Sequence, residues 1–135
     1  MDISITSDDQ GLWIQTWFDG KTRYFDISDP FNAKQLYEHK IGEQVNMISQ
    51  SWDGKRLYFS SSLLANWDRK QGKDDLQYVK LYHWDVEMQK MKLKFEIDFL
   101  KEKLGFPHQM RFGAYSLYGE APASAQSVKV SEATR

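Results

Sequence analysis

Three histidines, His39, His83 and His108, are the side chains best suited to bind a metal or transfer a proton near neutral pH. His39 stands between two oppositely charged residues in a predicted outer strand, so we expect it to be a solvated surface residue. His83 shares a predicted strand face with apolar neighbours, which favours a core or strand-end histidine over a metal ligand. His108 lies in a predicted loop, where functional residues concentrate. One imidazole makes no metal site, so a structural loop histidine remains equally consistent with the sequence.

Other residue patterns that could carry chemistry are weak. The adjacent carboxylates Asp8-Asp9 favour a turn over a shared proton, and Asp74-Asp75 lie in a polar segment. The sequence has no cysteine, no nucleotide-binding glycine loop, no Gly-x-Ser-x-Gly elbow and no His-Glu-x-x-His motif. Five tryptophans could stack on carbohydrate, but packing between sheets is the commoner use of aromatic area.

The composition indicates one globular domain, or part of one, in 135 residues. Lys and Arg total 18 against 19 Asp and Glu, so no strong field attracts nucleic acid or an anionic membrane. No apolar run is long enough to span a bilayer, and residues 1–4 do not resemble a signal peptide. The high aromatic content with few prolines favours β-sheet.

The first half of the sequence predicts four short strands, at residues 2–6, 12–18, 21–27 and 35–41. Turn-forming clusters separate them, including Asp19-Gly20 and the proline-containing stretch 28–32. In the second predicted strand, Leu12, Ile14 and Phe18 share one face and Trp13 and Trp17 the other. Because both faces are apolar, we expect this strand to be covered on both sides.

The second half predicts four more strands, at residues 45–52, 55–61, 76–86 and 90–99, with a polar surface insertion at 66–75. Asp53-Gly54 predicts a two-residue hairpin turn with positive φ at its centre. In the last strand we expect an apolar inward face and a charged outward face, which is typical of an exposed sheet edge. The inward residues are Met91, Leu93, Phe95, Ile97 and Phe99.

The two halves repeat. Ser7-Asp8-Asp9 followed by Leu12-Trp13-Ile14 matches Ser51-Trp52-Asp53 followed by Leu57-Tyr58-Phe59, and Tyr24-Phe25-Asp26-Ile27 matches His83-Trp84-Asp85-Val86. A four-stranded repeat of roughly forty residues is typical of β-propeller blades, although an ordinary sandwich of hairpins is the alternative. Propellers are closed rings, so we expect these two meanders to be part of a larger closed propeller or of an assembly.

Beyond the repeat, four segments resemble the selenium-binding protein and methanethiol oxidase family, in the carboxy-terminal part of its members and closest to the bacterial methanethiol oxidases. The resemblance covers about residues 2–113. The tail at 114–135 is small and polar, and we expect it to be flexible. The similar segments are 45–68, Tyr24-Phe25-Asp26-Ile27-Ser28-Asp29-Pro30, the stretch 98–105, and Pro107-His108-Gln109-Met110-Arg111-Phe112.

The resemblance implies an oxidase that converts methanethiol, oxygen and water to formaldehyde, hydrogen sulfide and hydrogen peroxide, with copper implicated. It makes His108 a candidate copper ligand within the family's His-x-x-Arg-aromatic motif, and Arg111 a candidate residue supporting that ligand. The family's cysteine motif and histidine-rich segments have no counterpart here. We therefore expect an inactive fragment of a longer enzyme in sulfur metabolism.

The alternative is a non-catalytic propeller module whose loops bind a protein partner. For the enzyme, the expected partners are a small thiol substrate and the missing blades, or further copies of the chain if it self-associates. We expect neither nucleic-acid binding nor a membrane span. The expected location is the periplasm if an upstream signal peptide exists, with the cytoplasm as the alternative.

Overall fold

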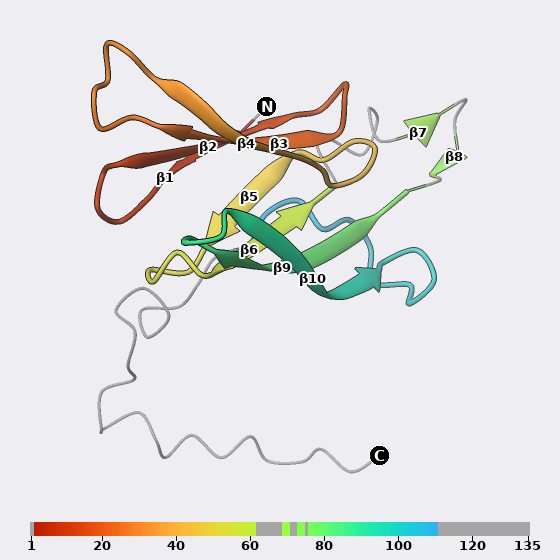
Figure 1. Cartoon of the computed structure of the whole chain (residues 1–135). Coiled ribbons are helices and arrows are strands. Elements are labelled where there is room, and N and C mark those ends of the chain that lie inside the picture. The colour runs from red at the N-terminus through yellow and green to blue at the C-terminus, as the bar shows by residue number, and fades with distance from the viewer. Residues whose placement is uncertain (1, 62–68, 71–72, 75, 111–135) are drawn as a thin grey trace, which may run out of the picture.

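The protein consists of β-strands and turns throughout the part that the computed structural model describes, which is residues 2–61, 69–70, 73–74 and 76–110 (Figure 1). One antiparallel sheet has the order β1-β2-β3-β4 and a second the order β10-β9-β6-β5. The predicted all-β architecture of two four-stranded meanders is confirmed. Figure 1 shows the two sheets stacked as layers.

The strands of the first sheet are β1 (Asp2–Ile5), β2 (Gly11–Thr16), β3 (Lys21–Asp26) and β4 (Lys34–Lys40). Those of the second are β5 (Met47–Gln50), β6 (Arg56–Ser60), β9 (Tyr78–Asp85) and β10 (Lys90–Asp98). The predicted polar insertion contains a short hairpin, β7 (Arg69–Lys70) and β8 (Lys73–Asp74).

The main core lies between the two sheets and is largely aromatic. Trp13 of β2 and Trp84 of β9 meet edge to face, with ring centroids 5.0 Å apart, and Tyr24 of β3 packs against both. Aromatic pairs of this kind add about 0.5–1.5 kcal/mol beyond the area they bury. The buried residues of this cluster are Trp13, Ile41, Val45, Ile48, Leu57, Phe59, Tyr78, Tyr82 and Trp84.

Strand β2 differs from its prediction at its end. It stops at Thr16, so Trp17 and Phe18 belong to the following turn, and Phe18 is 97% exposed. The Asp19 carboxylate caps this turn by accepting hydrogen bonds from Thr16 and from the backbone N–H of Lys21, and these bonds compete with strand extension.

Strand β10 is the outermost strand of its sheet, as predicted, but its alternation is not regular. Leu93 pairs with Tyr82 and Phe95 with Leu81, so Lys94 is an extra residue in a bulge. A bulge moves the following side chains to the opposite face of the sheet. Leu93, before the bulge, still pairs with the core residue Tyr82, whereas Phe95, after it, lies on the opposite face and is 41% exposed. The prediction of a single inward face is therefore wrong.

The β5–β6 turn is longer than the predicted two-residue hairpin. Ser51 N–H donates to the Arg56 carbonyl and Gly54 N–H to the Ser51 carbonyl, which makes a four-residue loop, 52–55. Of its residues only Gly54 has a positive φ, at 68°. The positive φ at Gly54 is confirmed, and the primed turn type is wrong.

The β1–β2 turn has the same structure, which establishes the repeat in three dimensions. Asp9, with φ of 58°, takes the place of Gly54, and Thr6 takes the place of Ser51. In each turn the hydroxyl donates a hydrogen bond to the carboxylate of the second loop residue, which is Asp8 in the first turn and Asp53 in the second. Thr6 therefore corresponds to Ser51. The match of Ser7 with Ser51 made from the sequence was wrong by one residue.

The third strands also align differently from the prediction. Leu12 pairs with Phe25, and the corresponding Leu57 pairs with Tyr82. Phe25 thus corresponds to Tyr82 instead of Trp84, a shift of two residues that keeps each side chain on the same face.

The repeat indicates that the two sheets are successive blades that pack through equivalent faces. Ile48 and Leu57 face the first sheet and are buried, whereas their counterparts Ile3 and Leu12 lie on the free face of the first sheet. Ile3 is 56% exposed. The free face of the first sheet thus has the same apolar pattern as the face of the second sheet that packs against its neighbour. This is expected of successive β-propeller blades.

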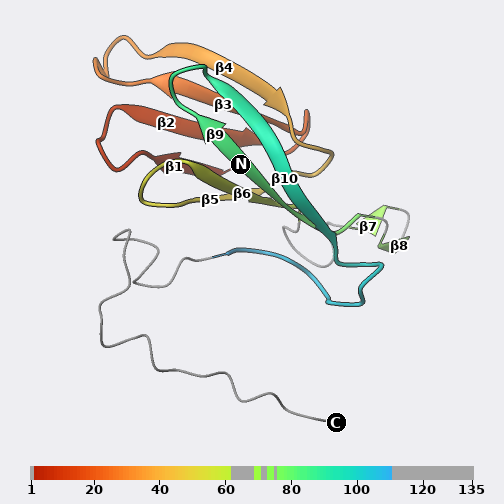
Figure 2. The same ribbon diagram turned by 60° about the horizontal axis from the view of Figure 1, so that its bottom comes forward.

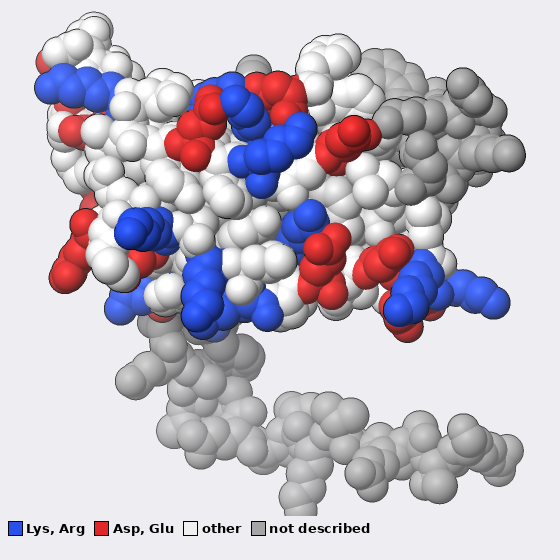
Figure 3. Space-filling view, turned by 45° about the vertical axis from the view of Figure 1, so that its right-hand side comes forward, with Lys and Arg blue, Asp and Glu red and all other residues white. Residues whose placement is uncertain are grey.

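Charge on the surface is mixed. Figure 3 shows Lys and Arg side chains interspersed with Asp and Glu on the face drawn, and the whole sequence has a formal net charge of −1. Within the described residues, no helix is long and apolar enough to cross a membrane.

Candidate functional site

His108, the predicted copper ligand, lies on a segment that follows β10 and returns across the second sheet. Its carbonyl accepts a hydrogen bond of 2.8 Å from Ser60 Oγ, and the preceding Pro107 is buried. The His108 side chain is exposed to solvent. Arg111, the predicted supporting residue, lies outside the described residues.

His39 is not the solvated residue that the sequence predicts. It lies on the face of β4 that meets the second sheet, stacked on Tyr37 and edge to face with Tyr82, with a centroid distance of 5.5 Å to Tyr82. Burial between the sheets lowers the pKa of His39, and the positive charge of Lys80 lowers it further. This histidine is a neutral packing residue with Tyr37 OH 3.4 Å from its Nδ1.

His83 is a half-buried strand residue, as predicted. It pairs with Arg56 across β6 and β9 and shares its face with Leu81. Beside it is an open cleft of about 280 Å³ that is also lined by Lys55 and Asp85.

The described residues do not form a copper site. No group of three or more His, Asp or Glu side chains comes together among them in a way that could hold a metal ion. His39 and His108 also lie on opposite sides of the second sheet, since one packs against the first sheet and the other follows a segment on the far face. One exposed imidazole supplies too few ligands to define a copper geometry.

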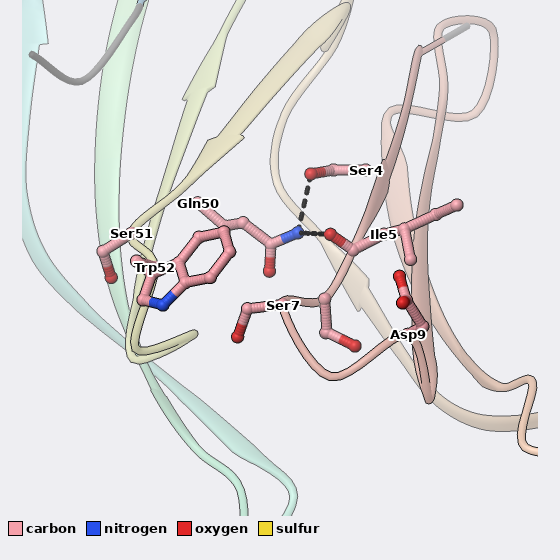
Figure 4. Close-up of a pocket in the computed structure, with 8 residues that line it drawn as sticks. Ser4, Ile5, Ser7, Asp9, Gln50, Ser51 and Trp52 are labelled. Carbon is pink, nitrogen blue, oxygen red and sulfur yellow. Dashed lines mark hydrogen bonds between the residues drawn. The ribbon is translucent and has the colours of Figure 1, made fainter. Parts of the chain in front are cut away.

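A larger cleft, of about 460 Å³, opens where β1 and β5, the first strands of the two sheets, end (Figure 4). Sequence reasoning did not single it out, because its walls come from the two corresponding turns and meet only after the sheets stack. The signal available was the repeat itself, which places equivalent turns at the same end of adjacent blades. The lining residues are Ser4, Ile5, Thr6, Ser7, Asp9, Gln50, Ser51 and Trp52.

Gln50 joins the two sheets at this cleft. Its Nε2 donates to Ser4 Oγ at 2.7 Å and to the Ile5 carbonyl at 2.6 Å. A carbonyl only accepts, so these bonds fix which end of the amide is nitrogen. Figure 4 shows the remaining amide oxygen directed toward the opening between Trp52 and Ser7. Gln50 Oε1 is buried and has no hydrogen-bond partner among the described residues.

The cleft is therefore suited to a ligand that donates hydrogen bonds. Gln50 Oε1 and the Asp9 carboxylate are acceptors, and Trp52, which is 50% exposed, offers an aromatic surface beside them. A buried acceptor without a partner costs about 1–3 kcal/mol, which a donor group entering the cleft would recover. The hydroxyls of Thr6 and Ser51 that line the cleft are held by the turn carboxylates of Asp8 and Asp53.

The fold and these sites define a class of protein, a pair of β-propeller blades with a cleft at the ends of the first strand of each blade. The model of the 56kDa selenium binding protein family (SBP56) matches residues 1–116, and the chain belongs to that family. The resemblance inferred from the sequence is confirmed.

One relative supports this assignment by its sequence, and one solved structure agrees with the fold. A methanethiol oxidase from Ruegeria pomeroyi is 60% identical over 118 residues, which are 87% of this chain and 26% of the relative. The X-ray structure of a hypothetical selenium-binding protein from Sulfolobus tokodaii superposes with a TM-score of 0.64 at 24% identity, covering 73% of this chain and 26% of that one. The chain thus spans about a quarter of the length of the relatives it matches.

A second solved structure has the same fold. The β-propeller domain of Cps50 (Swd1) from Myceliophteria thermophila superposes with a TM-score of 0.54 at 14% identity, covering 76% of this chain and 30% of that domain. At this identity the match concerns the fold alone, and it supports the propeller-blade architecture.

Proposed function

We propose that this chain is the carboxy-terminal part of a methanethiol oxidase-like oxidoreductase. The complete enzyme converts methanethiol, oxygen and water to formaldehyde, hydrogen sulfide and hydrogen peroxide, so the methyl carbon is oxidised by two electrons while oxygen is reduced to peroxide. The observation that carries the proposal is the 60% identity to the Ruegeria pomeroyi methanethiol oxidase over 118 residues.

The chain contributes only part of the structure of that enzyme. It supplies two blades, the cleft at the ends of β1 and β5, and one exposed imidazole on the segment after β10. Copper remains part of the proposal, with His108 as one ligand and Arg111 as a supporting residue. Part of the ligand set would come from outside the described residues, because no group of three or more His, Asp or Glu side chains comes together among these. The 135-residue chain alone is expected to be inactive.

A chimaera tests the proposal directly. The matched segment of the Ruegeria pomeroyi enzyme is replaced by residues 1–116 of this chain, and formaldehyde and hydrogen sulfide release from methanethiol are measured. We expect turnover by the chimaera and none by the isolated chain. A chimaera that folds and assembles like the parent enzyme but releases neither product would overturn the proposal. The parent enzyme is the positive control.

A second candidate is a non-catalytic propeller module. It is supported by the cleft at Gln50 and Trp52, whose buried Gln50 Oε1 can accept a hydrogen bond from a ligand. In that case the chimaera is inactive and Gln50→Leu weakens capture of a protein partner. For the oxidase we propose a periplasmic location if a signal peptide precedes this sequence in the longer protein, with the cytoplasm as the alternative. We propose neither nucleic-acid binding nor a membrane span. Fractionation of cells that express the full-length protein distinguishes the two compartments.

A further inference from the structure

The cleft at Gln50 lies at the other end of β5 from His108. Gln50 is the last residue of β5, whereas His108 is held by Ser60, which pairs with Met47 at the start of that strand. Figure 2 shows the segment that contains His108, in blue, on the side of β5 and β6 that faces away from the first sheet. A ligand in the cleft is therefore remote from the candidate copper residue, and the cleft is a second site that lies beyond the proposed oxidase function.

Several hydrogen-bond donors at the cleft are already used within the protein. Gln50 Nε2 donates to the first sheet twice, to Ser4 Oγ and to the Ile5 carbonyl. The hydroxyls of Thr6 and Ser51 donate to the carboxylates of their own turns. The groups left for a ligand are chiefly acceptors, so the cleft favours a ligand that donates hydrogen bonds.

Asp9 gives the cleft a negative charge. It is the one charged side chain among the described residues that line the cleft, and it is exposed to solvent. An anion would be repelled by this carboxylate. A metal ion would lack ligands, because no group of three or more His, Asp or Glu side chains comes together in the described part of the chain. The charge therefore favours an organic cation.

Trp52 supplies an aromatic surface for that cation. Its side chain is 50% exposed, and Figure 4 shows the indole ring beside Gln50 Oε1. This oxygen is buried and has no hydrogen-bond partner among the described residues, so the half-exposed ring must move slightly aside before a donor can reach it. A guanidinium group suits this arrangement, because it can stack on an aromatic ring while its N–H groups donate in its own plane.

We propose that the cleft binds a guanidinium group, which stacks on Trp52 and donates hydrogen bonds to the Asp9 carboxylate and to Gln50 Oε1. The group can belong to a free guanidino compound or to an arginine side chain, since the chemistry of recognition is the same. Asp9 comes from the β1–β2 turn and Trp52 from the β5–β6 turn. The bound cation would consequently link the two blades.

Titration of the 135-residue chain with methylguanidinium tests the proposal, with the backbone amide signals followed by heteronuclear NMR. We expect saturable shifts at residues 4–9 and 50–54, and none at 106–110. Urea has similar planar N–H groups without the charge, and tetramethylammonium has the charge without N–H groups. Each should bind roughly tenfold more weakly or worse than methylguanidinium, because charge and donors are both needed.

A second ligand distinguishes the two sources of the guanidinium. N-acetyl-arginine amide carries the same group on a short piece of polypeptide. Tighter binding of this compound than of methylguanidinium would indicate an arginine side chain, and no gain in affinity would indicate a free guanidino compound.

Asp9→Asn is the decisive variant. It removes the charge at nearly the same size, and asparagine tolerates the positive φ of 58° at this position, so the turn is kept. We expect it to weaken methylguanidinium binding roughly tenfold, and Trp52→Ala to weaken it by a similar factor. Glu102→Gln is the matched control, because it removes an exposed carboxylate outside the cleft and should leave the affinity unchanged.

Three results would each overturn the proposal. They are equal affinity of Asp9→Asn and the wild-type chain, equal affinity for urea and methylguanidinium, and no saturable shift at the cleft in a chain whose dispersed amide spectrum shows that it is folded. Binding is measured without turnover, so the outcome does not depend on the proposed oxidase activity.

Discussion

Trp13 and Trp84 form the central contact between the two blades, with ring centroids 5.0 Å apart at an interplanar angle of 85°. Both side chains are almost fully buried. Trp84→Ala is expected to lower the free energy of unfolding by about 3–5 kcal/mol, because it leaves a cavity between the sheets. Urea denaturation measures this loss. Phe18→Ala is the control, since Phe18 is 97% exposed and its removal should change stability by about 0.5 kcal/mol or less.

The left-handed residue of the repeated turn gives a second prediction. Gly54 has a φ of 68° and open space around the position of a Cβ, so any penalty for a side chain there comes from the backbone. Gly54→Val should destabilise by about 1–2 kcal/mol, because a β-branched residue is strained at positive φ. Gly54→Asn should cost clearly less, since asparagine tolerates this conformation. Equal melting temperatures for the two variants would contradict this account.

The succession of strands could be predicted from the sequence because alternation and turn residues are local signals. Side-chain placement failed where one extra residue changed the register. Lys94 is bulged in β10, and Leu36 is skipped in the β3–β4 pairing, where Tyr24 pairs with Tyr37 and Phe25 with Gln35. Bulges depend on how two strands meet, which local periodicity does not reveal.

The position of His39 had a usable signal. It shares its strand face with Tyr37, two residues earlier, and an aromatic neighbour on that face indicates packing instead of solvent. The cleft at Gln50 had no local signal, because its walls come from turns that lie far apart in the sequence. A metal site could not be predicted from one histidine, since its remaining ligands would have to be identified in three dimensions.

The neutral His39 predicts a pH dependence of stability. Burial and Lys80 lower its pKa in the folded state, so the unfolded chain binds the proton more readily. Its contribution to stability is present above the unfolded pKa of about 6.5 and is lost as the pH falls through that value toward the lower folded pKa. Midpoints of urea unfolding between pH 8 and pH 5 test this. In His39→Gln the decrease over this range should be smaller, and an unchanged profile would show that His39 does not cause it.

The last prediction concerns His108 in the full-length protein. His108 lies on the segment that crosses the second sheet, and its exposed side chain can meet ligands from other parts of the longer protein. His108→Ala should then lower bound copper and methanethiol oxidation together, by roughly tenfold or more, because the loss of one imidazole weakens the metal site. Gln109→Ala removes the neighbouring exposed side chain and should leave both quantities unchanged. Metal analysis of the purified variants, with hydrogen sulfide release as the activity, separates the cases. Full copper occupancy and full activity in His108→Ala would show that His108 is a structural loop residue. Its contribution would then be the backbone carbonyl that accepts a hydrogen bond from Ser60 Oγ.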